Sequence, residues 1–421
     1  MKNKKMEIIS FNMSNFSEWE KGVVNRNRHL FYKLLASPEV KRIVAVDFLP
    51  FTFKRALRNY GQNVIRRLKL KDQKLKSKTI YQDLTTRCVE VKGFSAELYI
   101  FSTIESIFSH KRVIQKLNRV LDKINSQSPS TQSPSIRVPR LVWSCFPMFK
   151  EHFQLKADLF VFDAVDNWLS HPSFKKQEEI LKNNYQVISQ KSDLIFTVSD
   201  NLIEFFKEQG RKENLFWVSN GVDYHHFNKI KPSLPSDLTS LKRPIIGYLG
   251  IIQQRIDINL LEYLAQNNPD KSFVLVGPLW PVYFRKLRRP AVEIKRLRQY
   301  KNIYFLGKKE YNQTPAYLNN FDVAFCPHIL NEFVRSTNSL KILEYLASGV
   351  PIVTTPSSGV ERFSHLVNIA EDYESFNKKI NQVLSEDNLE KRQARKEKAQ
   401  ENDWENKIKE IIKIINKNIR T

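Results

Sequence analysis

The stretch STNSLKILEYLASGVPIVTT, residues 336–355, decides the fold because it joins a helix to a strand with almost no connection between them. Its first half is crowded with apolar side chains at helical spacing, and its second half is β-branched. Gly349 and Pro351 stop the helix directly before the strand. Lys341 and Glu344 interrupt the apolar face, so this interior helix carries two charges that need a ligand or a partner.

Runs of the same apolar, β-branched kind recur along most of the chain, separated by longer amphipathic stretches. Continuous apolar runs are typical of parallel strands that helices cover on both faces. Strands are predicted at residues 6–11, 42–48, 97–102, 140–146, 158–165, 193–199, 215–221, 244–250, 272–278, 302–307, 323–328, 351–355 and 366–370. Their alternation with helices predicts an α/β protein made of doubly wound, Rossmann-like domains.

The length of 421 residues favours two domains, because single cores seldom grow beyond about 250–300 residues. Residues 228–244 carry three prolines and little to bury, which is typical of a linker. We therefore predict an N-terminal domain at 1–228, a linker at 229–243 and a C-terminal domain at 244–395. Residues 396–421 are predicted to end in an amphipathic helix whose apolar side needs a docking surface.

The basic charge of the chain requires its own explanation. Lys and Arg number 68 against 44 Asp and Glu, which gives a formal net charge of +24. Basic residues concentrate in 53–80 and 283–301, where apolar residues recur at helix-like spacing, and this combination suits an anionic lipid surface. A solvated basic face is the alternative. Nucleic acid also matches the charge, but no nucleic-acid-binding module is recognisable, and we predict no such partner.

Cysteine usage and apolar run length bear on the location of the protein. Cys88, Cys145 and Cys326 are far apart and form no Cys-x-x-Cys motif, which favours a reducing compartment. No apolar stretch reaches the roughly 18 residues of a membrane span, and the apolar run near the N-terminus is too short for a signal peptide. We expect a cytoplasmic protein that is soluble or peripheral to a membrane.

The start of the 336–355 stretch has the features of a phosphate site. Asn338 and Ser339 begin the helix, so its free N–H groups and positive dipole end suit an anion. Lys341 in the first turn opposes the dipole, which makes sense if an anion lies nearby. An ionised Glu344 on the second turn can accept two hydrogen bonds from a vicinal diol such as ribose. The alternative is a partly buried Glu344 paired with a neighbouring Lys or Arg.

The segment NSLKILEYLASGVPIVTT resembles the donor-site signature of family 4-type glycosyltransferases with the GT-B fold, the glycosyl transferases group 1. The resemblance covers roughly residues 155–421, and more loosely the first 150 residues through SNFSEWEKGVVNRNRHL. It implies two Rossmann-like domains facing a cleft, with the donor on the C-terminal domain, the acceptor on the N-terminal domain, and a C-terminal helix that packs back on the N-terminal domain. Matching segments follow the family's order at residues 192–206, 217–227, 244–265, 272–278, 302–328 and 403–411.

The resemblance also implies donor-binding residues. Glu344 takes the place of the family's ribose-binding Glu, and the backbone amides of Ser339 and Leu340 fall where the diphosphate binds. Ser336 stands where the family has a second Glu that contacts the donor sugar in retaining members. Arg255 lacks the Lys that usually accompanies it, a charge that Lys341 is expected to supply. The predicted donor-binding residues are Gly250, Arg255, Lys308, Ser336, Asn338, Ser339, Leu340, Lys341 and Glu344.

In the N-terminal half, LFVFDAVDNWLSHPSF at 159–174 ends a strand with two carboxylates. We predict Asp163 and Asp166 as catalytic residues, because an Asp at a strand end can deprotonate or hold an acceptor hydroxyl. Capping of the next helix is the alternative for Asp166. Contacts to the donor phosphates or the acceptor are predicted for the first loop and its helix, at Gly22, Arg26 and His29. No metal site is predicted.

These features together predict a transferase that moves a sugar from a nucleotide-sugar to a lipid-linked or saccharide acceptor in cell-surface polysaccharide synthesis. The resemblance implies transfer with retention and without a metal, and the nucleotide-sugar is a substrate and not a cofactor. The expected location is the inner face of the cell membrane. Two alternatives stay open: a non-hydrolysing sugar-nucleotide epimerase on the same fold, and a binding protein that has lost catalysis, for which Ser336 is the argument.

Overall fold

A computed structural model describes the chain at residues 5–20, 22–47, 49–53, 56, 76–127, 137–228, 233–279, 294–331, 334 and 337–419. The chain divides into two compact units. Unit 1 comprises Met1–Thr197, Leu202–Val218 and Ile408–Thr421, and unit 2 comprises Val198–Asn201 and Ser219–Lys407. Most of the basic segments 53–80 and 283–301, together with Ser336, lies outside the described residues.

Unit 1 is built on a sheet with the strand order β3-β4-β5-β2-β1-β6-β7-β8-β9 in the described residues. The pairs β3–β4 and β4–β5 are antiparallel, and the other neighbours are parallel. The central strands are continuous apolar runs buried along their length, as parallel strands with helices on both faces should be. The strand bounds are β1 Met6–Phe11, β2 Val40–Val46, β3 Ser77–Gln82, β4 Thr86–Val91, β5 Glu97–Thr103, β6 Arg140–Ser144, β7 Leu159–Ala164, β8 Leu194–Thr197 and β9 Leu215–Trp217.

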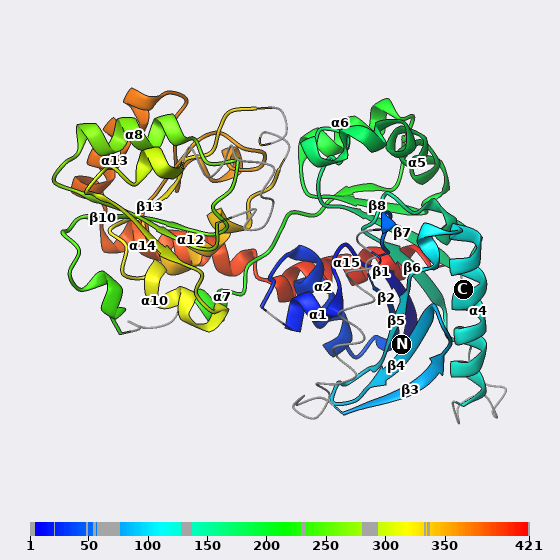
Figure 1. Ribbon diagram of the computed structural model, residues 1–421. Helices are drawn as coiled ribbons and strands as arrows, with labels where there is room; N and C mark the ends of the chain where they lie inside the picture. The colour runs from blue at the N-terminus through cyan, green and yellow to red at the C-terminus, as the bar shows by residue number, and fades with distance from the viewer. Residues whose placement is uncertain are drawn as a thin grey trace. The chain divides into compact units, whose positions relative to one another are not determined.

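Helices lie on both sides of this sheet, with α2 at Arg26–Ala36 and α4 at His110–Ser126 on opposite faces (Figure 1). Ser109 is the N-cap of α4, and its side chain accepts a hydrogen bond from the backbone N–H of Arg112. Its apolar side faces the core through Val113, Ile114, Leu117, Val120, Leu121 and Ile124. The other helices of this part are α1 Phe16–Glu20, α5 Glu178–Lys191 and α6 Asp200–Glu208, with short 3-10 turns η2 Glu105–Ile107, η4 Lys150–Gln154 and η5 Pro172–Gln177.

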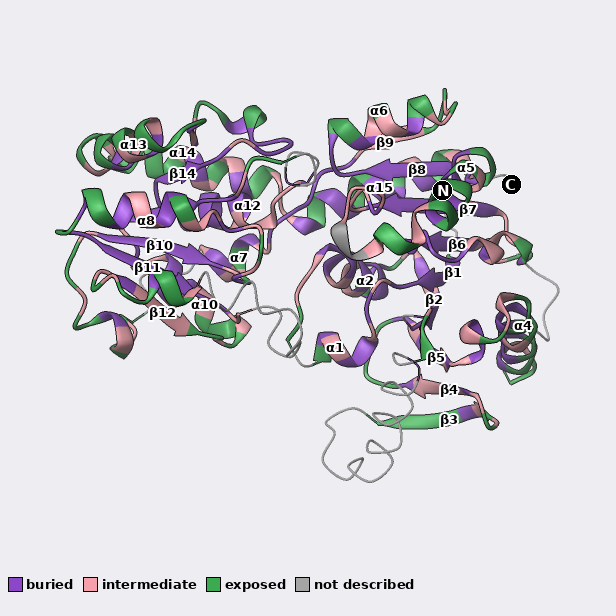
Figure 2. Ribbon diagram, turned by 45° about the horizontal axis from the view of Figure 1, so that its top comes forward, coloured by how far each residue is buried: buried purple, intermediate pink, exposed green. Residues whose placement is uncertain are grey.

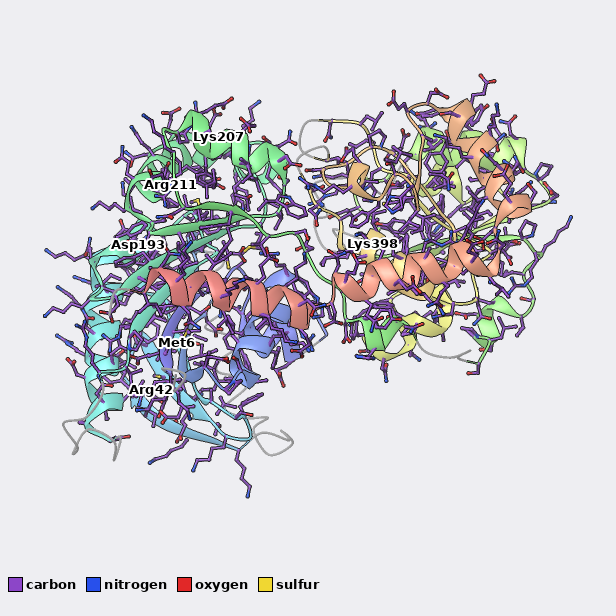
Figure 3. The ribbon with its side chains drawn as sticks, turned by 180° about the vertical axis from the view of Figure 1, so that it is seen from behind. Met6, Arg42, Asp193, Lys207, Arg211 and Lys398 are labelled. Carbon is purple, nitrogen blue, oxygen red and sulfur yellow. The ribbon has the colours of Figure 1, made fainter. Side chains whose placement is uncertain are left out.

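Two arginine side chains form hydrogen bonds near the N-terminal ends of strands in unit 1. Arg42 on β2 donates from Nε to Glu97 at 2.8 Å and from Nη1 to Glu7 at 3.4 Å. Arg211 holds the connection that follows α5 by donating to the backbone carbonyl oxygens of Ser189, Ser192 and Asp193, and it also donates from Nε to that of Glu213. Arg211 and Asp193 are labelled in Figure 3. These contacts satisfy backbone and carboxylate oxygens that the strand ends would otherwise leave buried without donors.

Unit 2 is built on a fully parallel sheet in its described residues, with the order β12-β11-β10-β13-β14-β15. Its central strands are buried (Figure 2). The helices α8 and α13 cover one face, and α10, α12 and α14 cover the other (Figure 1). The bounds are β10 Ile245–Leu249, β11 Ser272–Val276, β12 Ile303–Gly307, β13 Val323–Cys326, β14 Ile352–Thr354, β15 Asn368–Ile369, α7 Tyr224–Phe227, α8 Ile258–Asn267, α10 Thr314–Leu318, α12 Leu340–Ser348, α13 Tyr373–Glu386 and α14 Leu389–Glu401.

The observed elements agree with the predicted α/β class, with two differences. Each predicted strand is present, the first with the predicted bounds and the others with changed ends, but the antiparallel strands β3 and β4 were not predicted. The units are also divided differently from the predicted domains: residues 219–228 and 396–407 belong to unit 2, and residues 408–421 belong to unit 1. The last helix, α15 at Trp404–Asn418, therefore passes from one unit to the other. None of the described helices combines the length and hydropathy that a membrane span requires.

Candidate functional site

The predicted donor stretch forms α12 and β14 at one end of the unit 2 sheet. Gly349 ends the helix in the left-handed conformation at φ 79°, a backbone geometry that glycine adopts without strain. The apolar side of α12 is buried through Ile342, Leu343, Tyr345, Leu346 and Ala347. In a parallel sheet the carboxyl ends of neighbouring strands meet at the same edge, so the residues after β10, β13 and β14 gather there.

Lys341 extends from α12 across the end of β10. A side chain at Gly250, where φ is 148°, would place its Cβ 2.1 Å from Lys341 Cε. The ammonium group of Lys341 lies 5.6 Å from the ring centroid of Tyr248, within cation–π range. Gly250 therefore matters here because its missing side chain leaves room for Lys341.

Lys341 and Glu344 have no ion pair or hydrogen bond to their charged groups within the described part of the chain. The alternative interpretation, a Glu344 paired with a neighbouring cation, is therefore not found there. Burial raises the pKa of Glu344 to about 7, although the charge of Lys341 acts in the opposite direction. Burial also lowers the pKa of Lys341, and Arg255 adds to that shift. Two half-buried charges without bonding partners are typical of a site whose ligand supplies them.

A second set of polar contacts positions the N-terminus of α12. Ser339 is the N-cap residue but makes no side-chain cap, and the N–H groups of Ser339 and Leu340 have no acceptor in the described residues. Asn220 donates from Nδ2 to the carbonyl oxygen of Asn338 at 2.7 Å, and its own N–H donates to Asn338 Oδ1 at 3.2 Å. Asn220 Oδ1 is buried and has no hydrogen-bond partner among the described residues. This contact fixes the residue that precedes the N-cap, and therefore the direction of the free N–H groups.

Two residues at the end of β13 belong to the same group and were not predicted. His328 lies with its ring nitrogens 3.5 and 3.6 Å from the Cys326 sulfur. Burial lowers the pKa of His328 well below its ordinary value, and the positive charges of Lys341 and Arg255 add to this shift. Arg255 lies beside the residues that follow β13, because its carbonyl oxygen accepts a hydrogen bond from the N–H of Ile329 at 2.8 Å, and its predicted contact with phosphate stays a prediction.

The structure does not bring every predicted donor residue into this group. Lys308 follows β12 at the edge of the sheet, where it is exposed and pairs with Glu310 at 3.6 Å. In the sheet order, strands β11 and β10 lie between β12 and β13. Ser336 lies outside the described residues, so its predicted role stays a prediction. Gly250, Arg255, Asn338, Ser339, Leu340, Lys341 and Glu344 do lie together.

In unit 1, Asp163 and Arg26 form a buried ion pair. Arg26 donates from Nε to both carboxylate oxygens at 3.2 and 3.0 Å and from Nη2 to Oδ1 at 2.9 Å. Asp163 is 0% exposed and Arg26 is 4% exposed. The carboxylate is thus occupied by a guanidinium and shielded from solvent, which favours a structural role for Asp163 over the predicted catalytic one. The same ion pair occupies the guanidinium of Arg26, which we predicted to contact phosphate or the acceptor.

The remaining predicted residues of unit 1 lie near the same strand ends. Asp166 is half-buried in the loop after β7, and its carbonyl oxygen accepts a hydrogen bond from the Tyr185 hydroxyl at 3.5 Å. His29 is buried on α2, one turn after Arg26. Gly22 lies exposed between α1 and α2, where φ is 85°. Of the two predicted carboxylates, Asp166 is the one that remains partly accessible.

Arg26→Ala tests the structural role of Asp163. Removing the guanidinium leaves a buried carboxylate unpaired, so we expect the free energy of unfolding at pH 7 to fall by about 3–5 kcal/mol in urea titrations. Arg28→Ala is the matched control on the same helix, because Arg28 contacts the Tyr32 ring at 5.1 Å and makes a cation–π contact worth about 1 kcal/mol. Equal losses in both variants would contradict the structural assignment.

Glu344→Gln tests the buried charge in the protein without ligand. A carboxyl whose pKa is about 7 in the folded protein and 4.5 in the unfolded chain binds more protons when folded, so its contribution to stability falls as the pH rises from about 5 to 7. The variant should therefore be more stable than the parent at pH 8, by on the order of 2 kcal/mol in urea titrations, and the difference should shrink at pH 5. Glu371→Gln, at an exposed position of unit 2, should show neither effect. A stabilisation independent of pH would contradict the assignment.

Comparisons with known proteins agree with this architecture. Residues 243–386 match the family described as Glycosyl transferases group 1. A Bacillus subtilis (strain 168) protein named as a teichuronic acid biosynthesis glycosyltransferase, TuaH, is 26% identical over 254 residues, covering 57% of this chain and 60% of that protein, which is less than two thirds of its length. Anabaena Alr3699/HepE in complex with UDP-glucose has a TM-score of 0.61 at 15% identity, over 98% of this chain and 100% of that one. A trehalose-6-phosphate structure from E. coli bound with UDP-2-fluoro glucose has a TM-score of 0.64 at 11% identity, over 97% and 98%. The chain therefore has the GT-B fold, and its residues 243–386 are similar to the glycosyl transferases group 1 family.

Proposed function

We propose that the protein is a glycosyltransferase that moves a sugar from a nucleotide-sugar to a saccharide or lipid-linked acceptor in polysaccharide synthesis. The observation that carries this proposal is that Lys341 and Glu344, and the N–H groups at the start of α12, have no bonding partner among the residues that the structure describes. A nucleoside diphosphate presents the complementary groups, which are two phosphates for the cation and N–H groups and a ribose diol for the carboxylate. The family match over 243–386 includes both residues and supports the proposal.

Each residue has a stated role in this proposal. Glu344 accepts hydrogen bonds from the ribose hydroxyls, while Lys341 and Arg255 neutralise the diphosphate together with the N-terminus of α12. In the transfer, the bond between the anomeric carbon and the diphosphate oxygen breaks and the acceptor oxygen bonds to that carbon. The proton of the acceptor hydroxyl passes to the nucleoside diphosphate, which leaves. Asp166 is the proposed group that holds the acceptor hydroxyl. We propose retention at the anomeric carbon on the strength of the motif resemblance.

The proposed setting is the inner face of the cell membrane, where the protein is peripheral and cytoplasmic. The formal net charge of +24 supports attraction to an anionic lipid surface. A lipid-linked acceptor would be presented at that surface. The relative from Bacillus subtilis is named for teichuronic acid biosynthesis, which supports an acceptor of the polysaccharide class.

Nucleotide titration of the full chain tests the site. We expect UDP, the nucleotide in the Anabaena complexes, to bind at pH 8, and Glu344→Gln to weaken binding of both UDP and uridine by about 1.5–3 kcal/mol, since both carry the ribose diol. Asn220→Ala should weaken UDP and leave uridine unchanged, because it disturbs only the N–H groups that face the phosphates. Glu371→Gln is the control. If Glu344→Gln leaves affinity intact and lowers the melting temperature, Glu344 is structural.

Metal dependence is a separate test. Because Lys341, Arg255 and the helix N-terminus supply positive charge to the diphosphate, we expect transfer to continue at an unchanged rate after EDTA treatment. The measurement is release of nucleoside diphosphate together with glycosylated product from a nucleotide-sugar panel. Activity that returns only with Mn²⁺ or Mg²⁺ would contradict the charge argument.

A further inference from the structure

Two large apolar side chains of unit 1 are exposed on neighbouring turns. Leu84, between β3 and β4, is 93% exposed, and Phe108, which follows η2, is 59% exposed. Single exposed apolar residues are common on proteins, but these two turns are joined. Thr85 donates from Oγ1 to Glu105 at 2.6 Å, and the N–H of Ile104 donates to the carbonyl oxygen of Thr85 at 3.1 Å. Leu84 and Phe108 are therefore exposed on two turns that are joined by hydrogen bonds, and we call this pair of turns the 84/108 tip.

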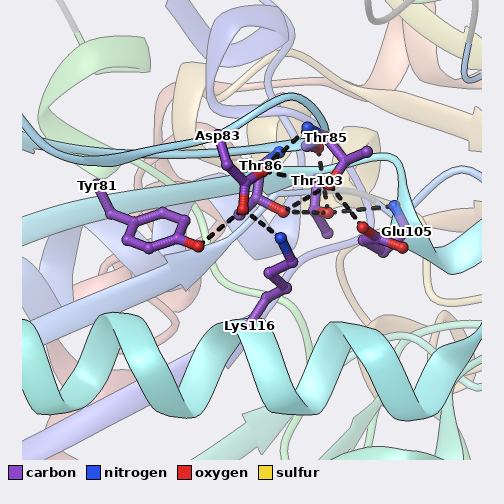
Figure 4. Close-up of polar contacts among 7 residues, drawn as sticks. All are labelled: Tyr81, Asp83, Thr85, Thr86, Thr103, Glu105 and Lys116. Carbon is purple, nitrogen blue, oxygen red and sulfur yellow. Dashed lines mark hydrogen bonds and ion pairs between the residues drawn. The ribbon is translucent and has the colours of Figure 1, made fainter.

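A polar network holds the turn that carries Leu84 (Figure 4). The Asp83 carboxylate accepts hydrogen bonds from the N–H groups of Thr85 and Thr86, both at 2.9 Å, and from the Tyr81 hydroxyl at 2.7 Å. It also forms an ion pair with Lys116 of α4. The turn is thus fastened to the helix beside it. Because this turn is already fixed, burying the Leu84 side chain in a lipid layer costs little conformational entropy. This favours the 84/108 tip as a binding element.

The surface next to the tip is basic. Helix α4 begins two residues after Phe108, and its apolar face is already buried in the core. Its exposed face carries Lys111, Arg112, Arg119 and Lys123 against a single exposed acid, Asp122. Residues Lys76 and Lys78, on and before the edge strand β3, are exposed as well. An apolar tip beside a cationic helix face is the pattern that binds anionic lipid headgroups and inserts at their acyl boundary.

We propose that the 84/108 tip and the basic face of α4 dock unit 1 on an anionic lipid bilayer. A second copy of the chain fits this surface poorly, because it would bring two cationic helix faces together, and two apolar side chains are too few for the core of a protein–protein interface. The inference rests on the membrane association proposed above and specifies the surface that makes it. It is independent of whether Glu344 and Lys341 bind a nucleotide.

Liposome sedimentation of the full chain tests the surface. We expect binding to vesicles of phosphatidylcholine with phosphatidylglycerol at 0.1 M NaCl, little binding to phosphatidylcholine alone, and release near 0.5 M NaCl, because the attraction is screened over about 10 Å at 0.1 M salt and less at higher salt. Leu84→Ser with Phe108→Ser should lower partition by about tenfold or more, since two apolar side chains no longer enter the bilayer. Leu389→Ser, which alters a residue 83% exposed in unit 2, is the apolar control and should leave partition unchanged.

A charge pair completes the experiment. Lys111→Glu should lower partition several-fold, whereas Lys212→Glu changes the net charge equally at another exposed position of unit 1 and should not. Circular dichroism and UDP titration of each variant check that the fold and the α12 site are intact. Parent-like binding by the Leu84/Phe108 variant overturns the inference. If charge reversal at Arg66, Arg67 and Lys69 instead abolishes binding, the membrane proposal stands and this surface is the wrong one. Failure of the parent chain to bind either vesicle overturns both.

Discussion

The attachment of helix α12 to the end of strand β10 determines the arrangement of the unit 2 site. Lys341 crosses the position where Gly250 has no side chain, and the Tyr345 hydroxyl bonds to both the N–H and the carbonyl oxygen of Leu249, at 3.0 and 3.3 Å. Two consecutive backbone positions therefore receive the helix. With α12 fixed in this way, its first N–H groups and Glu344 keep a defined direction and depth, which an anion-binding site requires.

This arrangement has an energetic cost in the protein without ligand. Lys341 and Glu344 are desolvated without forming a bond to each other. Burial lowers the pKa of Lys341 and raises that of Glu344, so it favours the neutral form of both. A hydrophobic pair of similar size would suit the same helix better if packing alone mattered. The retained charges are best explained by a ligand that supplies opposite charge and hydrogen bonds, so that stability is recovered on binding.

Sequence patterns predicted the parts of the fold that depend on long apolar runs and missed those that do not. The central strands and α12 have uninterrupted periodicity, and their positions follow from it. In β3 only Ile80 is buried, and the strand is polar and exposed on both sides at its start, so no apolar run marks it. The two charged residues of α12 could be predicted as site residues from the sequence because they interrupt an apolar face. The pairing of Asp163 with Arg26 and of Asn220 with Asn338 joins positions 137 and 118 residues apart, and only the folded chain reveals them.

The path of the chain through the two units has a consequence for how the protein is made. Unit 1 takes its last segment from residues 408–421, where Ile411 and Ile415 are fully buried. On a ribosome, most of unit 1 leaves the exit tunnel before unit 2, but its core stays incomplete until residues 408–421 have been synthesised. While nearly two hundred further residues are synthesised, the apolar surface of unit 1 that residues 408–421 cover stays exposed. Unit 2 can complete its core before unit 1 does. Chains that terminate early would then lose the first unit and keep much of the second, and chaperones would be needed mainly by nascent unit 1.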